Sequence, residues 1–507
     1  MNIVYLTTEA VPFAKTGGLA DVCGTLPKVV AAQGHRCAVI MPAFSSIERS
    51  LQPIETTDIS FAVPMSDQKL IGCRLLKSHL PKDPNDPEDS AEVPVYFIDQ
   101  PQYFRRPSLY GDANGDYHDN AERFIFYCRA AIIAMTRLGY PVDLVHCNDW
   151  QSALVPALLR AASDNVAKTQ PIATMLSIHN MAYQGNFGFD AFPWTGLSWD
   201  HFRPESFEYY NQLNFLKTGV VTSDVVSTVS PTYALEIQTP QYGCGLDSIL
   251  QGIPQPVAGI INGIDTNIWN PETDPHLKRN YSVADWADAK IDNKLALQAE
   301  VGLPQDPDVP LLGLIGRLAD QKGWDLILPV LKQHLAESRP TQWVVLGSGD
   351  PKIETQLREL TEQHPEQLAA YIGFSDALAH RIEASSDMFI MPSHYEPCGL
   401  NQLYSLRYGT PCVVTKTGGL ADTIVDATPE NVAANLATGF HLNDSSAGAL
   451  DHAINRALQL RYHSPEKWKN LVEFGMSQDW TWRKSADQYI QLYARTISLN
   501  RRRRSGS

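Results

Sequence analysis

The glycine-containing stretch Lys15–Val22, Lys-Thr-Gly-Gly-Leu-Ala-Asp-Val, constrains the fold of this chain more than any other segment. It follows the apolar run Ile3–Leu6, which predicts a strand, and it opens a segment with helical periodicity. The apolar face of that predicted helix carries Leu19, Val22, Leu26, Val29 and Val30. A strand, a glycine turn and a helix start bring N–H groups and a positive dipole end to one point, which suits a phosphate. A turn of this kind is weak evidence alone, but its first seven residues recur at 416–422.

The size and charge of the chain limit its class. At 507 residues, two domains of roughly 200–250 residues are expected, because a single core stops growing at that size. A hydrophobic fraction of 44% and a charged fraction of 19% are typical of a globular protein. The net charge of −15 argues against nucleic acid or an acidic membrane surface as the main partner. An anionic ligand must therefore meet a local cluster of cations.

Targeting signals are not visible in the sequence. Glu9 interrupts the first apolar run, no basic segment precedes it, and no apolar stretch reaches membrane-spanning length. The eight cysteines lack disulfide or metal spacing, which is typical of a reduced compartment. We expect a cytoplasmic protein, or a protein of the plastid stroma if the chain is a mature plant protein.

Short apolar segments alternate with helical patterns along the whole chain, which predicts two doubly wound parallel sheets. The predicted strands are Ile3–Leu6, Cys37–Met41, Val93–Ile98, Leu144–Cys147, Ile172–Ile178, Asp224–Ser230, Leu311–Ile315, Trp343–Leu346, Ala370–Ile372, Met388–Met391 and Cys412–Thr415. Residues 51–80 predict a hairpin or side sheet, and the Pro- and Asp-rich residues 81–92 predict a mobile surface loop.

The same pattern predicts the domain boundaries. Residues 1–258 form one Rossmann-like domain, completed by the C-terminal helix 480–500, and residues 259–479 form the second. The basic residues 501–507 are expected to be a disordered tail. Two such domains facing a central cleft could close over a nucleotide and exclude water.

Polar residues follow several predicted strands, at the sheet edge where open α/β sheets bind ligands. Asp149 and His179 do so in the first half, although a helix N-cap and a structural histidine are the common roles of such residues alone. In the second half, Arg317 and Lys322 are close enough in sequence to converge on one diphosphate. A surface ion-pair role for these two cations is about equally favoured.

A turn-forming segment, Ser393–Asn401, follows the predicted strand Met388–Met391. The N–H groups of its last three residues would begin a helix, and Glu396 suits sugar hydroxyls, although a helix N-terminal charge is the alternative. Cys398 has no His or Asn partner pattern and is interpreted as a packing residue. Six such loops with charged residues in two domains are hard to explain by structure alone.

These motifs occur in the order found in bacterial glycogen synthases and plant starch synthases, which the chain resembles over roughly residues 1–495. The motifs that carry the resemblance are Lys15–Leu19, Asn148–Trp150, His179–Gly185, Asn262–Asp265, Gly316–Leu318, Gln321–Gly323 and Glu396–Leu400. The resemblance implies a GT-B fold and retaining transfer of glucose from ADP-glucose. The acceptor would be the non-reducing 4-hydroxyl of an α-1,4-glucan or maltooligosaccharide.

The resemblance also implies roles for individual residues. The catalytic set would be Lys15, Asp149, His179, Arg317, Lys322 and Glu396. The nucleotide-sugar site would comprise Lys15, Gly17, Gly18, Asn262, Arg317, Lys322, Phe374, Glu396, Cys398, Gly399, Leu400, Asn401 and Tyr404. Within these sets, the cations and the amides of Gly18 and Leu400 would hold the diphosphate. His179 and Glu396 would hold the glucose, and Asp149 would lie on the acceptor side.

Two aromatic positions are part of the implied nucleotide site. Phe374 would stack on adenine, with core packing as the alternative, and Tyr404 would lie near the ribose or phosphate. The chain departs from the family pattern at Asn148 and Gln151, where His is common, and both departures concern the acceptor side.

No Asp-x-Asp motif follows a predicted strand, so we expect no metal and no cofactor, with arginine and lysine neutralising the leaving diphosphate. No carboxylate suited to be a nucleophile is left over, which favours attack on the same face of the sugar. The alternatives are a GT-B enzyme using UDP-glucose and a non-catalytic glucan-binding homologue. A dinucleotide oxidoreductase is disfavoured, because no Gly-x-Gly-x-x-Gly follows the first strand.

Overall fold

The computed structural model describes residues 1–50, 52–66, 69–82, 88, 90–112, 115–161 and 172–505. Six of the twelve residues of the predicted surface loop at 81–92 lie outside these residues. The chain divides into two compact units, residues 1–263 with 482–507 and residues 264–481, each of which is described by itself. These boundaries lie a few residues beyond the predicted ones, so Asn262 belongs to the first unit.

The first unit is built on a nine-stranded sheet of order β14-β13-β9-β8-β1-β2-β5-β4-β3. Its strands are β1 Asn2–Leu6, β2 Arg36–Pro42, β3 Glu55–Ser66, β4 Lys69–Leu80, β5 Val93–Asp99, β8 Leu144–Asn148, β9 Ala173–Ile178, β13 Val225–Thr228 and β14 Ala258–Gly259. All neighbours from β14 to β5 are parallel, whereas β3 and β4 form an antiparallel hairpin, as predicted for residues 51–80. Small additional strands are β6 Gly111–Asp112, β7 Gly115–Asp116, β10 Asn186–Gly188, β11 Glu208–Tyr209 and β12 Gln212–Asn214.

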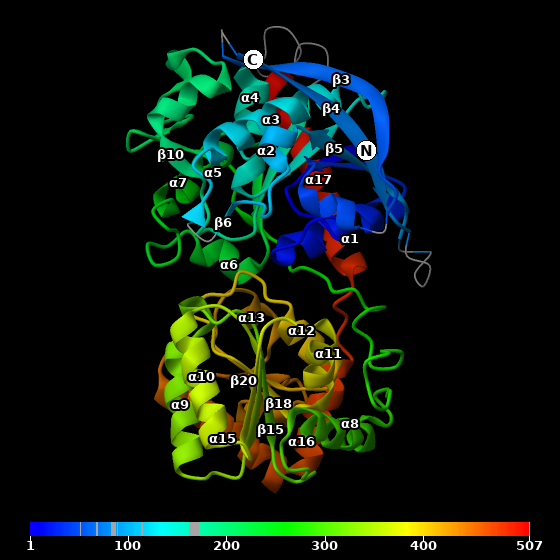
Figure 1. Ribbon diagram of the computed structural model, residues 1–507, viewed down its shortest axis with the longest axis vertical. Helices are drawn as coiled ribbons and strands as arrows, with labels where there is room; N and C mark the ends of the chain where they lie inside the picture. Colours follow the sequence, from blue (N-terminus) through cyan, green and yellow to red (C-terminus); the bar gives the residue numbers. More distant parts are fainter. Residues whose placement is uncertain are drawn as a thin grey trace. The chain divides into compact units, whose positions relative to one another are not determined.

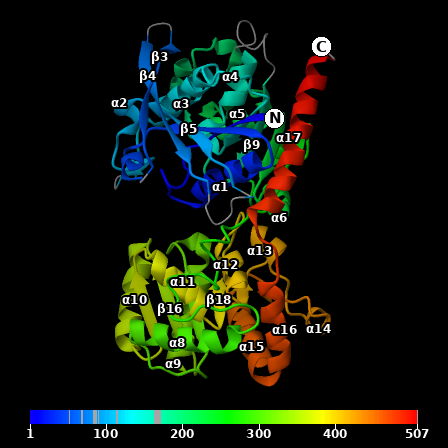
Figure 2. The same ribbon diagram turned by 90° about the vertical axis from the view of Figure 1, so that its right-hand side faces the viewer.

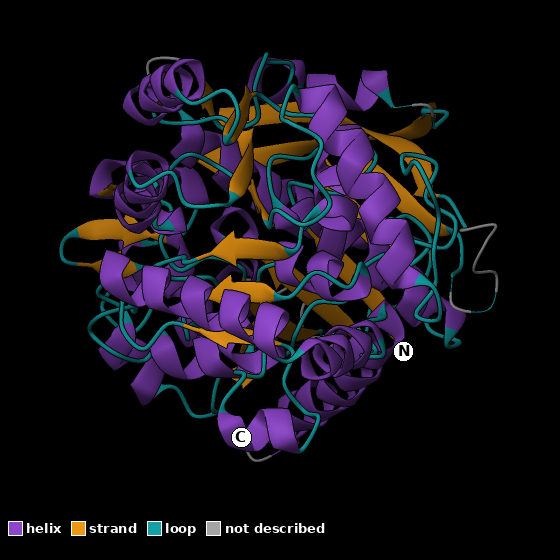
Figure 3. Cartoon of the chain, turned by 90° about the horizontal axis from the view of Figure 1, so that it is seen from below, coloured by secondary structure: helices purple, strands orange, loops and turns teal. Residues whose placement is uncertain are grey.

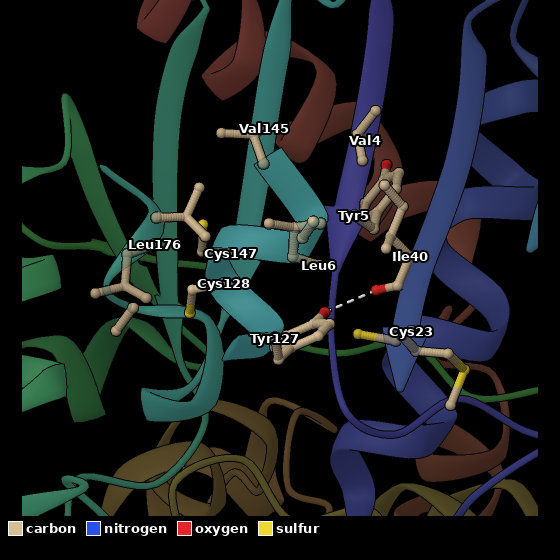
Figure 4. Close-up of a cluster of buried hydrophobic side chains, with 14 of the residues drawn as sticks. Val4, Tyr5, Leu6, Cys23, Ile40, Tyr127, Cys128, Val145, Cys147 and Leu176 are labelled. Carbon is tan, nitrogen blue, oxygen red and sulfur yellow. Dashed lines mark hydrogen bonds between the residues drawn. The ribbon is translucent and has the colours of Figure 1, made fainter. Parts of the chain in front are cut away.

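Helices cover this sheet (Figures 1 and 2). They are α1 Gly18–Ala32, α2 Pro101–Phe104, α3 Asn120–Met135, α4 Val155–Ala161, α5 Phe215–Thr222, α6 Pro231–Glu236, α7 Asp247–Gly252 and α17 Trp482–Ser505, with 3₁₀ turns η1 Ser45–Arg49, η2 Trp150–Ser152, η4 Phe189–Thr195 and η5 Trp199–His201. The C-terminal helix α17 packs against α1, β8 and β9, and so completes the N-terminal unit. Figure 4 shows the core around β1, where the Tyr127 hydroxyl donates to the Ile40 carbonyl at 2.8 Å.

The C-terminal tail differs from its prediction. Helix α17 continues through the arginines to Ser505 instead of giving way to a disordered tail at residue 501. The physical reason lies in Asp224, whose side chain is only 3% exposed and needs a counter-charge. Arg503 Nη1 lies 2.9 Å from Asp224 Oδ1 and supplies that charge.

The second unit contains a six-stranded parallel sheet of order β17-β16-β15-β18-β19-β20. Its strands are β15 Leu311–Ile315, β16 Gln342–Gly347, β17 Leu368–Ile372, β18 Met388–Met391, β19 Cys412–Val414 and β20 Gly439–His441. The first five were predicted. The sixth was missed, because three residues that begin with glycine carry no periodic signal.

The helices of this unit are α8 Trp286–Val301, α9 Trp324–Ala336, α10 Pro351–Gln363, α11 Asp376–Ser385, α12 Asn401–Arg407, α13 Gly418–Thr423, α14 Pro429–Ala433, α15 Ala447–His463 and α16 Pro465–Met476, with the 3₁₀ turn η6 Asp320–Lys322. Helices α9 and α10 lie on one face of the sheet, and α8 and α11 lie on the other (Figure 1). Figure 3 shows the same layering, with strands between helices. The prediction of two Rossmann-like, doubly wound units is confirmed.

Each sheet has one point where the order of its strands reverses. In the first unit this point lies between β1 and β8, and in the second it lies between β15 and β18. Chains leaving two neighbouring strands there diverge to opposite faces, which opens a crevice for ligands at the carboxyl ends. Of the predicted site residues, Asp149 follows β8, Arg317 follows β15 and Glu396 follows β18.

Candidate active site

In the first unit, the loop after β1 is organised by Glu9, a residue that the sequence analysis did not assign. Its carboxylate is buried and accepts from the Thr16 amide at 2.5 Å and the Gly17 amide at 3.2 Å. It also accepts from the Thr16 hydroxyl at 2.6 Å and the Tyr110 hydroxyl at 2.7 Å. The Gly17 amide, predicted to contact the nucleotide sugar, therefore bonds to the chain's own carboxylate. The helix dipole favours an anion before the start of the helix, and the Glu9 carboxylate of the protein itself lies there.

Lys15 lies at the surface of the same loop. Its Nζ is 2.7 Å from Asp21 Oδ1, and the two side chains are 52% and 28% exposed. An exposed pair of this kind contributes roughly 0–1 kcal/mol, so the ammonium can leave Asp21 for a phosphate at little cost.

Asp149, directly after β8, has a strained backbone. Its φ of 55° and ψ of −178° lie in a region that glycine adopts but other residues avoid, at a cost of about 1–3 kcal/mol. Two hydrogen bonds hold this geometry: the Asp149 amide donates to Ser177 O at 2.9 Å, and Oδ1 accepts from the His179 amide at 2.7 Å. Strain held in this way is typical of functional sites. The helix-cap alternative is not what the structure shows, since the side chain makes no cap bond to the following turn.

His179 extends the network next to Asp149. Its Nε2 lies 3.0 Å from the side-chain oxygen of Asn148, whose amide nitrogen donates to Leu6 O and His146 O. This arrangement makes Nε2 the donor and leaves Nδ1 as an acceptor. Burial lowers the pKa of His179 to about 4, so the imidazole is neutral at neutral pH. Burial, with a smaller contribution from the charge of Glu9, raises the pKa of Asp149 to about 7.

Asn262 is also buried in the first unit. Its side-chain oxygen has no hydrogen-bond partner among the residues the structure describes. A buried acceptor without a donor is uncommon in a folded protein, and a ligand hydroxyl would satisfy it.

In the second unit, Lys322 and Glu396 are in direct contact. Lys322 Nζ lies 2.5 Å from Glu396 Oε2, which also accepts from the Ser393 hydroxyl at 3.1 Å. The Glu396 side chain is 8% exposed and that of Lys322 is 23% exposed. The two residues come from the loops after β15 and β18, on either side of the point where the strand order reverses. A cation and a carboxylate predicted to bind different parts of the donor thus bind each other in the free protein.

Arg317 is exposed and has an uncharged partner. Its Nη2 donates to Gln321 Oε1 at 2.8 Å, and Gln321 Nε2 in turn donates to Tyr395 O at 3.2 Å. The His394 amide donates to Gln321 O at 2.9 Å. Gln321 therefore joins the loop after β15 to the loop after β18, and places the guanidinium of Arg317 at the same edge.

The second copy of the glycine stretch supports the Glu396 loop. The Gly419 amide donates to Glu396 O at 3.0 Å. A Cβ atom added at Gly418 would lie 2.0 Å from Glu396 O, and one at Gly419 would lie 1.9 Å from Cys398 O. Only glycine permits this approach between two backbones. The Cys398 side chain is buried, in agreement with its interpretation as a packing residue.

The remaining predicted residues lie around α12. Gly399 has a φ of +73°, Leu400 is the N-cap of α12, and Asn401 Nδ2 donates to Ile315 O at 2.9 Å. The Tyr404 ring stacks on Trp269 with a centroid distance of 3.7 Å and an interplanar angle of 9°. Phe374 is 83% exposed, which excludes core packing and leaves its ring faces accessible.

Sequence reasoning missed Glu9, Tyr110, Ser393 and Gln321 as organising residues. Glu9 and Ser393 could have been suspected, because both lie within three residues of a predicted strand end. Tyr110 and Gln321 could not, because their role depends on contacts that sequence spacing does not specify.

Comparison with known proteins agrees with this geometry. Residues 2–252 match a family model described as the starch synthase catalytic domain, and residues 299–474 match one described as glycosyl transferases group 1. The chain is 99% identical to a glycogen synthase of Rhodopirellula baltica over 507 residues, covering 100% of both chains. It is 45% identical to a glycogen synthase of Syntrophotalea carbinolica, covering 99% of this chain and 100% of the relative. The chain belongs to the glycogen synthase and starch synthase family.

Solved structures support the same assignment. The catalytic domain of starch synthase IV from Arabidopsis thaliana, bound to ADP and acarbose, superimposes with a TM-score of 0.87 at 33% identity, covering 98% of this chain and 99% of that domain. A sucrose-phosphate synthase from Thermosynechococcus elongatus, with a TM-score of 0.57 and 18% identity over 98% of this chain and 99% of that one, shares the fold. The predicted GT-B fold is confirmed, and the chain is a glycosyltransferase of this family. No helix in the described part of the chain has the length and apolar character needed to span a membrane.

Proposed function

We propose that the chain transfers glucose from ADP-glucose to the 4-hydroxyl at the non-reducing end of an α-1,4-glucan, with retention of configuration. The observation that carries this proposal is the contact between Lys322 and Glu396 at 2.5 Å. This contact joins one cation to one carboxylate, proposed here to bind sugar hydroxyls, at the strand-reversal point of the second unit.

The donor would separate this pair and use both members. Sugar hydroxyls donate well to a carboxylate, and a diphosphate accepts from an ammonium, so glucose would take Glu396 and the diphosphate would take Lys322. Replacing one charged partner by another avoids leaving a charge unpaired in a partly buried site. Arg317, held by Gln321 at the same edge, would add a planar pair of donors to the diphosphate.

The chemical step would depend on charge development. As the anomeric C–O bond breaks, negative charge grows on the diphosphate, and fixed cations stabilise that state more than the ground state. Retention through a covalent intermediate would require a free carboxylate on the opposite face. Glu396 is bonded to Lys322 and Ser393, and Asp149 is bonded to the His179 amide, so neither is positioned as a free nucleophile. We therefore propose same-face attack, in which the departing phosphate oxygen takes the proton of the acceptor hydroxyl.

Different observations support the proposed donor nucleotide and the proposed acceptor side. The related starch synthase domain was solved with ADP, which supports an adenine nucleotide as donor here. The exposed ring of Phe374 offers an adenine a stacking face. On the acceptor side, the network of Asp149 and His179 would orient the glucan, while Lys15 stays a predicted diphosphate ligand. The fixed cations supply the charge that a metal often supplies, so we propose turnover without a metal or cofactor.

The eight cysteines are all free thiols, which supports a reduced compartment such as the bacterial cytoplasm.

In the decisive experiment, the purified protein is incubated with a short maltooligosaccharide and either labelled ADP-glucose or labelled UDP-glucose. The linkages in the product are then analysed. We expect new α-1,4 linkages from ADP-glucose at a rate well above that from UDP-glucose. Faster use of UDP-glucose would establish the rival donor.

A kinetic test addresses the leaving-group role. Lys322→Ala should lower kcat by roughly 10²–10³-fold, as loss of a transition-state donor does, and should leave KM for the glucan nearly unchanged. Equal losses in both would contradict the role. A trapped glucosyl-enzyme would overturn same-face attack.

A further inference from the structure

A cluster of three metal-ligating side chains lies in the second unit, outside the residues assigned to the reaction. His276, Asp376 and His380 each offer a ligand atom, and these atoms all lie within 4.8 Å of one another. Asp376 and His380 are four residues apart at the start of α11, a spacing that places both on one face of the helix. His276 is half-buried, Asp376 is exposed and His380 is buried, so the cluster opens to solvent on one side.

One carboxylate, that of Asp274, contacts the His380 ring and the His276 backbone. Asp274 Oδ2 lies 2.7 Å from His380 Nδ1, and Oδ1 accepts from the His276 backbone amide at 2.8 Å. Tyr408 also donates to Oδ2, at 2.6 Å. The bond to Nδ1 fixes the His380 tautomer, so that Nε2 presents a lone pair. Histidines that bind metals in proteins commonly donate their other ring nitrogen to a carboxylate in this way, which also raises their basicity.

The second ring nitrogen of His380, Nε2, has no hydrogen-bond partner among the described residues. This nitrogen is buried. Its nearest charged neighbour in the cluster is Asp376 Oδ2, at 3.9 Å, which is too long for a hydrogen bond. A buried acceptor held in place by a buried carboxylate, with no donor of its own, is an unsatisfied group that a cation would satisfy.

We propose that His276, Asp376 and His380 bind a divalent transition-metal cation, with zinc as the ion that fits best. Two imidazoles and one carboxylate suit Zn²⁺, whereas Mg²⁺ and Ca²⁺ prefer oxygen ligands only. With metal–ligand bonds of about 2.0–2.1 Å, ligand atoms in a tetrahedron lie roughly 3.4 Å apart. The 3.9 Å separation of Nε2 and Oδ2 needs only a small side-chain movement to reach that value. Water completes the fourth position.

The bound cation would join the start of α11 to the loop that carries His276. The His380 ring also stacks on Trp269 with a centroid distance of 3.8 Å, and the Trp269 ring stacks on Tyr404 at 3.7 Å. The cation therefore stabilises this part of the second unit and reports through Trp269. It takes no part in glucosyl transfer, so metal binding and turnover can be tested separately.

The test is titration of chelator-treated full-length protein with Zn²⁺ by calorimetry, and with Co²⁺ by visible absorption. We expect one Zn²⁺ site per chain, a Co²⁺ spectrum of low coordination number, and a rise in Tm of about 5–10 °C at a hundredfold excess over Kd. His276→Ala and Asp376→Asn, both outside the buried core, should each weaken binding by at least tenfold.

His452→Ala is the matched control, because His452 is exposed in the same unit and outside the cluster, and it should bind like wild type. Quenching of tryptophan fluorescence by Co²⁺ should disappear in Trp269→Phe. Wild-type affinity in both His276→Ala and Asp376→Asn would overturn the site, as would no saturable binding in the wild-type protein.

Discussion

The sequence Lys-Thr-Gly-Gly-Leu-Ala-Asp occurs once in each unit of this chain, and its two copies have different surroundings. The first copy, residues 15–21, links β1 to the fifteen-residue helix α1. The second copy, residues 416–422, links β19 to the six-residue helix α13. In the first copy the Gly17 amide bonds to the Glu9 carboxylate, and in the second the Gly419 amide bonds to the Glu396 carbonyl.

The glycines of the two copies have different steric surroundings. A Cβ atom on Gly17 would have nothing within 4 Å, and the backbone there is extended, with a φ of −158°. On Gly418 and Gly419 a Cβ atom would lie about 2 Å from a carbonyl oxygen of the loop at Glu396–Cys398. The first copy therefore leaves space that a ligand can enter, whereas the second uses the same space for contact between backbones. An identical heptapeptide thus leaves open space beside its glycine in one place and supports a neighbouring loop in the other.

Substitution of glycine by alanine should separate the two copies most strongly. Gly418→Ala, at the position that matches Gly17, should lower the free energy of unfolding by about 3 kcal/mol or more, because the clash is with the backbone of Glu396 and not with a flexible side chain. Gly17→Ala should cost about 0.5–1 kcal/mol, the difference between glycine and alanine at an N-cap. Urea denaturation of both variants measures this.

Enzyme activity provides a second comparison between the glycine-to-alanine variants of the two copies. Gly17→Ala should lower turnover while the protein stays folded, because the methyl group occupies space next to the loop amides. Gly418→Ala should lose activity in step with its stability. Equal destabilisation by the two substitutions would show that the copies are structurally equivalent, against the contacts seen here.

The Glu9 carboxylate accepts hydrogen bonds from the loop of the first copy, and its contribution can be tested by substitution because it is a side chain. The Glu9 carboxylate accepts four hydrogen bonds. In Glu9→Gln only one of the two side-chain oxygens remains as an acceptor, because an NH₂ group replaces the other. Loss of a hydrogen bond to a charged group should lower the free energy of unfolding by about 2 kcal/mol. Thermal unfolding of the variant provides the measurement, and an unchanged Tm would mean that Glu9 is not what holds the loop.

The sequence predicted the alternating strands of both sheets, because buried parallel strands are short apolar runs between helices. It could not predict which polar residues meet. Lys322 and Glu396 are 74 residues apart, and their contact follows from β15 and β18 being neighbours. Spacing in the sequence could suggest only that Lys322 and Arg317 lie close enough to bind the same diphosphate.

Other features lie beyond local pattern altogether. The left-handed φ of Asp149 is imposed by its bonds to Ser177 and His179, residues on the neighbouring strand and the loop after it. The carboxylate of Glu9 competes with any phosphate for the same amides, and only the folded loop shows this. Local sequence predicts where a site lies more readily than what already occupies its hydrogen bonds.

A carboxylate close to the first copy should also make stability depend on pH. Asp149, beside Glu9, has a pKa of about 7 in the folded protein against an ordinary value of 3.8. Between pH 4 and 7 the unfolded chain has lost this proton and the folded chain keeps it. The stability contributed by Asp149 is thus full below pH 4 and is lost as the pH rises through 7.

Asp149→Asn should remove that contribution. His179, with a pKa lowered from 6.5 to about 4, acts in the opposite sense, since its stability is present above pH 6.5 and is lost as the pH falls through 4. In the wild type the two partly cancel. Relative to wild type, Asp149→Asn should therefore lose stability as the pH falls from 7 to 4, by at most about 1.4 kcal/mol per pH unit. A difference between the two proteins that does not vary with pH would contradict the assignment.

The lysines give the smallest effect on stability and the sharpest contrast in function. Lys15→Ala removes an exposed pair with Asp21, and Lys416→Ala removes an exposed lysine, so each should change the free energy of unfolding by less than about 0.5 kcal/mol. If the first copy alone binds the diphosphate, Lys15→Ala should raise KM for ADP-glucose or lower kcat by at least tenfold, whereas Lys416→Ala should match wild type. Steady-state kinetics on the pair, at fixed ionic strength, makes the comparison. Equal loss in both variants would mean that a lysine in this heptapeptide acts through general surface charge, because the second copy has no open space beside its glycines for a phosphate to enter.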